Sequence, residues 1–132
     1  MTISEKTQIE GITEPVIQSY FETLNAGDCK QTASLFALDG TLYPPFESPV
    51  VGQDAIATYL QTEATGMKLH PHEGTVETLE KDHIGVKVMG KVQTSLFRVN
   101  VAWTFVLNGV KEIISVEVKL LASLNELVNL KR

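Results

Sequence analysis

The chain has 132 residues, which fits one domain, and 43% of them are hydrophobic, enough for a buried core. The net charge of −5 and the scattered lysines and arginines exclude the clustered basic surface of a nucleic-acid-binding protein. No window suits a transmembrane helix and the N-terminus is polar, so we expect a cytoplasmic protein.

Helices are predicted in the first half of the chain. Residues 1–12 form a polar arm, and residues 13–132 form a single domain. Apolar residues at helical spacing predict a first helix, which begins at the N-cap residue Thr13 and ends at Gly27. Asp28 then caps a second helix.

The second helix is predicted to carry Phe36 on its inward face and to close by residue 40. A short strand follows over residues 41–43 and is stopped by two prolines. Residues 52–65 predict a third helix with one apolar face, which Gly66 breaks. The predicted helices therefore all precede residue 67, apart from a short one at the C-terminus.

Strands are predicted in the second half. Residues 67–80 are extended, with an interruption around Pro71, and residues 84–92 form the next strand. Apolar residues alternate over residues 97–107, which is a strong signal of a half-buried strand. The pattern is that of an antiparallel meander.

Asn108-Gly109 predicts a two-residue hairpin turn into a last strand over residues 114–120, and residues 123–130 predict a short terminal helix. Helices followed by a meander predict an α+β fold, a cone made by a twisted antiparallel sheet with the N-terminal helices packed on one face. The apolar concave side of such a cone is the expected ligand pocket.

Two side chains that each carry one polar hydrogen are predicted to point into the cone. Tyr20 shares a helix face with Leu24, and Trp103, the only tryptophan, shares a strand face with Phe105. When buried, each side chain needs a hydrogen-bond acceptor. Two explanations stay open at this point. The pair consists either of core aromatics that donate to backbone carbonyls, or of donors that meet on one ligand oxygen.

The sequence gives little support for a metal site or for a nucleophilic active site. His70, His72 and His83 lack the spacing of a metal site and are expected to be exposed. Cys29 is the only cysteine, so an internal disulfide is impossible. Its place at a helix N-terminus is expected to lower its pKa, but no histidine lies close in sequence to act as a base.

An acid–base isomerase or hydratase, of the ketosteroid isomerase type, is the competing interpretation, because cone folds of this kind host such enzymes. Such a site needs a carboxylate base in the pocket and an acidic donor opposite it. Glu47 follows the proline pair and is a candidate for the rim of the pocket. The other candidates are expected at a turn or on outward faces: Asp39, Glu63, Glu117 and Lys119.

Five stretches of the chain form a recognisable combination. They are Leu24-Asn25-Ala26 with Asp28, Gly40-Thr41-Leu42-Tyr43-Pro44-Pro45-Phe46, Gly90-Lys91-Val92-Gln93-Thr94, Asn100-Val101-Ala102-Trp103 and Leu120-Leu121-Ala122-Ser123. From about residue 9 to residue 132, the chain resembles the C-terminal domain of the orange carotenoid protein, the light sensor and photoprotective quencher of cyanobacteria. The resemblance implies a nuclear transport factor 2-like cone and a stand-alone domain, without the family's helical N-terminal domain.

The same resemblance implies a ketocarotenoid, of the canthaxanthin or echinenone type, as the ligand. In the family a helix tyrosine and a strand tryptophan donate hydrogen bonds to the 4-keto oxygen, and Tyr20 and Trp103 match them. No catalytic residue is implied, because the isomerase branch carries its aspartate where this chain has Tyr43-Pro44-Pro45. The residues that match the apolar tunnel lining are Leu24, Leu69, Val92, Phe105 and Val118.

Partners also follow from the resemblance. Stand-alone members look like homodimers that share one carotenoid and pass it between membranes and a helical carotenoid-binding domain protein. We therefore expect a carotenoid carrier and photoprotective, singlet-oxygen-quenching module, with transient membrane contact. The chain departs from the family at Ser95-Leu96, which replaces a Pro-Trp pair, and at Cys29. Residues 123–132 resemble the tail that covers the tunnel mouth.

Overall fold

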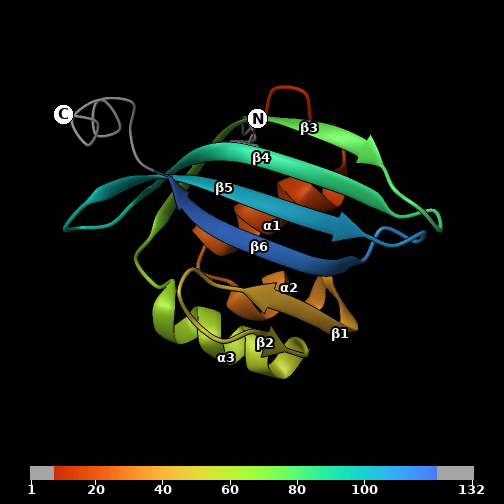
Figure 1. The fold of residues 1–132 in the computed structure, drawn as a ribbon. Helices are drawn as coiled ribbons and strands as arrows, with labels where there is room; N and C mark the ends of the chain where they lie inside the picture. The colour runs from red at the N-terminus through yellow and green to blue at the C-terminus, as the bar shows by residue number, and fades with distance from the viewer. Residues whose placement is uncertain (1–7, 122–132) are drawn as a thin grey trace, which may run out of the picture.

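One curved sheet of six strands wraps around the first helix in the computed structural model, which describes residues 8–121 (Figure 1). The strands lie in the order β2-β1-β6-β5-β4-β3. Their bounds are β1 Phe36–Tyr43, β2 Val50–Val51, β3 Lys68–Thr78, β4 Ile84–Gln93, β5 Arg98–Leu107 and β6 Ile113–Leu121. The helices are α1 Pro15–Asn25, α2 Cys29–Ser34 and α3 Gln53–Glu63. The predicted cone, with its helices on one face of the sheet, is confirmed.

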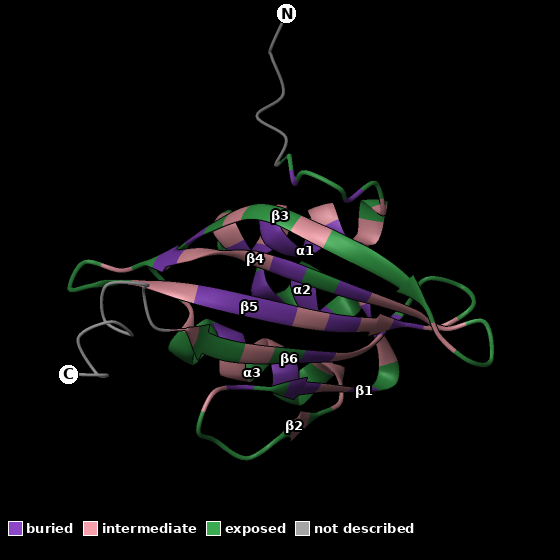
Figure 2. Ribbon diagram, turned by 45° about the horizontal axis from the view of Figure 1, so that its top comes forward, coloured by how far each residue is buried: buried purple, intermediate pink, exposed green. Residues whose placement is uncertain are grey.

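The core lies between α1 and the concave face of the sheet (Figure 2). Successive strand residues point to opposite faces, so the alternation along β5 turns Val101, Trp103, Phe105 and Leu107 toward the helix. The buried face of α1 repeats at three and four residues and consists of Ile17, Tyr20, Phe21 and Leu24. Both predicted donors therefore lie on the inner layer.

One strand pair differs from the predicted antiparallel arrangement. β1 runs parallel to β6, while the other neighbouring strands are antiparallel, so the sheet is mixed. Parallel neighbours need a long crossover, and the whole segment from β2 to β5 separates these two strands in the sequence. Local sequence patterns do not reveal a pairing over such a distance.

The second helix ends earlier than predicted. Phe36 is buried, as expected, but it begins β1 and pairs with Ile113 instead of belonging to the helix. The register of β1 against β6 shifts before Thr41. Gly40 lies at this irregularity, where a Cβ atom would come within 2.9 Å of the Ile113 carbonyl oxygen. The absence of a side chain at Gly40 thus permits the close approach of the two backbones within β1.

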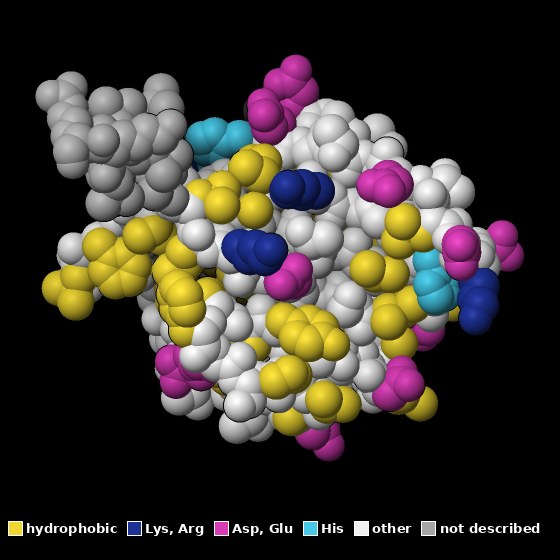
Figure 3. Space-filling view, in the orientation of Figure 1, with side chains coloured by type: hydrophobic (Ala, Val, Ile, Leu, Met, Phe, Trp, Pro, Cys, Tyr) yellow, Lys and Arg dark blue, Asp and Glu magenta, His cyan; other side chains and the backbone are white. Residues whose placement is uncertain are grey.

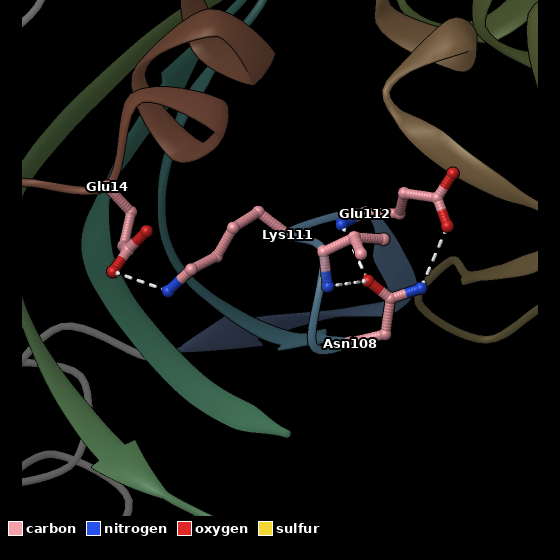
Figure 4. A network of polar contacts seen from close by, with 5 residues as sticks. Glu14, Asn108, Lys111 and Glu112 are labelled. Carbon is pink, nitrogen blue, oxygen red and sulfur yellow. Dashed lines mark hydrogen bonds and ion pairs between the residues drawn. The ribbon is translucent and has the colours of Figure 1, made fainter. Parts of the chain in front are cut away.

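The predicted two-residue turn at Asn108-Gly109 is wrong, because five residues separate β5 from β6 (Figure 4). The Asn108 side chain accepts hydrogen bonds from the backbone of Val110 at 3.1 Å and of Glu112 at 2.9 Å. Lys111 has a φ of 68° and forms an ion pair with Glu14 at 3.3 Å. The asparagine thus organises a longer loop that reaches the N-cap residue of α1.

The described part of the N-terminal arm is attached to the sheet. The Glu10 amide donates to the His72 carbonyl at 3.0 Å, and the Gly74 amide donates to the Glu10 carbonyl at 2.8 Å. Ile9 and Ile12 are buried on either side of this bridge. Residues 1–7 and the predicted terminal helix and tail lie outside the described residues. Within residues 8–121, no helix has the length and apolar character needed to cross a membrane.

Candidate ligand-binding site

An apolar cavity of about 250 Å³ opens between the sheet and the helices. Its walls come from α1, α3, strands β1 and β3 to β6, and three loops. Because strand residues two apart face the same side, Val99, Val101 and Trp103 all reach it from β5. An engineered cavity of ~150 Å³ holds benzene. The present cavity therefore has room for one substituted six-membered ring, and a long chain attached to that ring must protrude.

A cluster of aromatic rings supports two of the lining side chains. The ring centroids of Tyr20 lie 5.2 Å from Phe21 and 5.1 Å from Phe105, and those of Phe21 and Trp103 lie 4.8 Å apart. All three contacts are edge-to-face, a favourable geometry that fixes ring orientation. Tyr20 and Trp103 thus pack against the same ring of Phe21 and line the same cavity.

The polar atoms of these two side chains have no bonding partner in the described part of the chain. Tyr20 and Trp103 are each 2% exposed, and neither Oη nor Nε1 has a hydrogen-bond partner among residues 8–121. Both side chains line the cavity, so their polar hydrogens are candidates for hydrogen bonds to a ligand. Burial raises the pKa of the Tyr20 phenol far above its usual value, which keeps the hydroxyl a donor. Neither hydrogen is used by a backbone carbonyl of the described residues.

Most of the predicted lining residues reach the cavity. Leu24 comes from α1, Leu69 from β3, Val92 from β4 and Val118 from β6. Phe105 does not line it, because its fully buried ring stands behind Tyr20. The alternation along β5 correctly predicted that Phe105 faces inward. Whether its ring reaches the cavity depends on Tyr20 of α1, which lies against it.

Three polar side chains lie at the opening, and the sequence predicted only Glu47 there. We call this group the acidic mouth, and it consists of Glu47, Tyr59 and Glu63, which all line the cavity. The Tyr59 hydroxyl donates to Glu47 Oε2 at 3.2 Å. Burial, the Glu47 charge and hydrogen bond, and the Glu63 charge raise the pKa of Tyr59 to about 12. On the third predicted helix, the i, i+4 spacing of Tyr59 and Glu63 already indicated that the two side chains lie on the same helix face.

Exposed hydrophobic side chains lie in the cavity lining or next to residues that belong to it. We call these residues the apolar rim: Phe46, Leu96, Phe97 and Leu120. Phe97 and Leu120 line the cavity, while Phe46 and Leu120 line a neighbouring hollow. Phe46 is 93% and Leu96 is 87% exposed. Figure 3 shows hydrophobic side chains gathered at the left end of the sheet, where β4 turns into β5. Patches of this kind are typical of surfaces that meet a partner.

The remaining candidate residues lie away from the cavity. Cys29 is buried, and burial together with the Asp28 charge raises its pKa, so the expected lowering is wrong. A short helix end does not offset the loss of solvent around a thiolate. Within residues 8–121, no group of histidine, cysteine and acidic residues could hold a metal ion. The other acid–base candidates, Asp39, Glu117 and Lys119, are exposed and absent from the cavity lining.

Comparisons with known proteins give a consistent result. Residues 12–112 match the family model described as the nuclear transport factor 2 (NTF2) domain. The chain is 41% identical over 134 residues to the orange carotenoid-binding protein of Limnospira maxima, with 98% of the chain and 42% of that protein covered. The protein of the same name from Synechocystis sp. is 40% identical, with 96% and 41% covered. The chain thus spans about two fifths of the length of these relatives.

Solved structures agree with the sequence comparison. The structure of Fremyella diplosiphon OCP1 superposes with a TM-score of 0.86 at 38% identity, over 94% of the chain and 40% of that protein. The Orange Carotenoid Protein of Anabaena (Nostoc) sp. PCC 7120 binding canthaxanthin gives 0.86 at 39% identity, over 98% and 43%. The epoxide hydrolase/cyclase-like enzyme SalBIII is 19% identical with a TM-score of 0.61, which indicates a shared fold alone.

Proposed function

This chain belongs to the nuclear transport factor 2 family, and from its similarity to the orange carotenoid-binding proteins within that fold we propose that its cavity binds the keto-substituted end ring of a carotenoid, of the canthaxanthin or echinenone type. One observation carries the proposal. The buried side chains of Tyr20 and Trp103 line a cavity with mostly apolar walls, and their donors, Oη and Nε1, lack partners within residues 8–121. A single keto oxygen supplies the acceptor that both donors need.

The energetics assign different tasks to the apolar walls and to the donors. A ring buries about as much surface as an aromatic side chain, roughly 150–250 Å², which is worth about 4–6 kcal/mol at ~25 cal/mol/Å². Each neutral hydrogen bond adds about 0.5–1.5 kcal/mol net. The walls therefore supply most of the affinity. The donors fix the ring orientation and polarise the conjugated carbonyl, which shifts the absorption to longer wavelength.

The apolar rim supports a proposal about the partners of this protein. The cavity takes one ring, so the polyene protrudes past the exposed side chains of Phe46, Phe97 and Leu120. An exposed polyene needs a cover, and a second copy of this chain that binds the other ring supplies one. We propose a homodimer that shares one carotenoid and acts as a carrier and singlet-oxygen quencher. The same rim would contact a membrane, or a helical carotenoid-binding domain protein, during transfer.

Mixing the apoprotein with canthaxanthin-containing membranes tests this function. We expect a coloured protein after separation, and an absorption maximum that moves to shorter wavelength in Trp103→Phe while binding persists. The matched control is Phe97→Leu, which alters the rim and leaves both donors. A colourless protein would contradict pigment binding, and an unchanged spectrum in Trp103→Phe would contradict the hydrogen bond.

A small isomerase or hydratase is the second candidate, and the hydrogen bond from Tyr59 to Glu47 beside the cavity is the observation in its favour. Glu47 is exposed, whereas a general base of this kind works best in a water-poor site. The test is turnover of an enolisable cyclic ketone by the purified protein. Activity that is lost in Glu47→Gln would establish the enzyme in place of the carrier.

A further inference from the structure

The charged side chains that line the cavity all have one sign. Glu47 and Glu63 are the only charged side chains among its described lining residues, which include no lysine, arginine or histidine. Lys119 lines the neighbouring surface hollow instead, together with Glu117. An entering ligand therefore meets negative charge at the opening and no compensating cation along the walls.

The inner wall offers an anion no better site. Its two donors, Tyr20 Oη and Trp103 Nε1, are uncharged, and the surrounding lining is aliphatic and aromatic. A carboxylate moved there would leave water for two neutral hydrogen bonds, and burying an unpaired charge is far more costly than burying a keto oxygen. A ligand that enters with its charged end first is thus penalised.

The opposite orientation is penalised by the acidic mouth. There Tyr59 donates its only hydrogen to Glu47, so its hydroxyl is not free to bind a ligand anion. Glu63 follows Tyr59 by one helical turn and adds a second negative charge to the same opening. A carboxylate attached directly to the bound ring then lies at the opening beside two like charges, whose repulsion water and salt screen only in part.

We propose that Glu47 and Glu63 make this cavity selective for rings with uncharged substituents, so that it accepts rings that carry a keto, hydroxyl or ester group and rejects rings that carry a carboxylate. The inference rests on the proposed function, since it concerns which rings enter the same cavity. It identifies two specificity-determining residues and a class of excluded ligand, the cyclic terpenoid acids whose carboxylate is attached to the ring. Tyr59 acts as a positioning residue that holds Glu47 at the opening.

Two probes of nearly equal size, one charged and one neutral, test the proposal: 2,6,6-trimethylcyclohex-1-ene-1-carboxylic acid and its methyl ester. Trp103 is the only tryptophan and lines the cavity, so a change in its emission reports binding of either probe. The variant is Glu47→Gln combined with Glu63→Gln, in which the amide oxygen introduced at position 47 can still accept the Tyr59 hydrogen bond. The matched control is Glu77→Gln, which removes one exposed charge on β3 outside the cavity lining.

We expect the wild-type protein to bind the ester at least about tenfold more tightly than the acid at low salt, and the gap to shrink in high salt. The double variant should narrow the gap by about threefold or more, while Glu77→Gln leaves it unchanged. Equal affinities in the wild type, or an unchanged gap in the double variant, would overturn the inference and leave the proposed function standing. Failure of both probes to bind, together with a colourless protein in the canthaxanthin experiment, would overturn the proposed function itself.

Discussion

Replacing Tyr20 by phenylalanine should have opposite effects on the stability of the empty protein and on pigment binding. The hydroxyl is desolvated, and it has no hydrogen-bond partner among residues 8–121. Its removal therefore breaks no bond within that region and relieves an unpaired polar group. A neutral hydroxyl that is buried without a partner costs about 1–3 kcal/mol, and its partial contact with the cavity reduces this cost.

We expect Tyr20→Phe to leave the free energy of unfolding unchanged or to raise it by up to ~1 kcal/mol. The ring itself is retained, so its edge-to-face contacts with Phe21 and Phe105 persist. Canthaxanthin binding should weaken by about two- to twelvefold, because one hydrogen bond of roughly 0.5–1.5 kcal/mol is lost. Urea unfolding of the apoprotein and pigment titration measure the two quantities.

The matched control is Tyr59→Phe, which removes a hydroxyl that is paired, since it donates to Glu47 at 3.2 Å. This variant should bind canthaxanthin almost as tightly as the wild type. If Tyr20→Phe destabilised the empty protein by more than about 1 kcal/mol, its hydroxyl would be paired after all, and the reasoning from an open donor would fail.

Three further predictions concern the scaffold. In urea unfolding, Gly11→Ala should destabilise the protein more than Gly27→Ala. Both residues have a positive φ, but only the new methyl group at Gly11 would meet the Gly74 carbonyl. Equal losses of unfolding free energy in the two variants would contradict this contact. Cys29 should react with a thiol reagent at least about tenfold more slowly in the native than in the unfolded protein, since it is buried with a raised pKa, and similar rates would argue against it. The pKa of Tyr59 is raised from 10.0 to about 12, so its stabilisation is present below pH 10 and is lost as the pH rises through the folded value. Tyr59→Phe should flatten this alkaline loss in melts recorded across that range, and an unchanged slope would refute the assignment.

The sequence predicted the inner layer of this fold well, because burial is periodic. The alternation along β5 gave Trp103 its inward face, and the helical repeat of α1 did the same for Tyr20. These two patterns are local, so they survive without knowledge of the tertiary structure. The family resemblance then supplied the cone, which the family match and the solved structures confirm.

Features that depend on distant contacts could not be predicted in the same way. Phe36 is an apolar residue that would face inward in either a helix or a strand. It belongs to a strand because it pairs with Ile113, which is distant in the sequence. The depth of Phe105 depends on the ring of Tyr20 that covers it. The hydrogen bond from Tyr59 to Glu47 joins α3 to a loop, and no periodic signal marks such a loop position.

The carbonyl stretching band of bound canthaxanthin, labelled with carbon-13 at its keto carbons, tests the central proposal most directly. Infrared spectra of the wild-type complex should show one keto band at a lower frequency than in an apolar solvent, because hydrogen bonds from Tyr20 and Trp103 weaken the carbonyl bond. Each of Tyr20→Phe and Trp103→Phe should return the band part of the way. A wild-type band at the apolar-solvent frequency would contradict a ketocarotenoid ring held by these two donors.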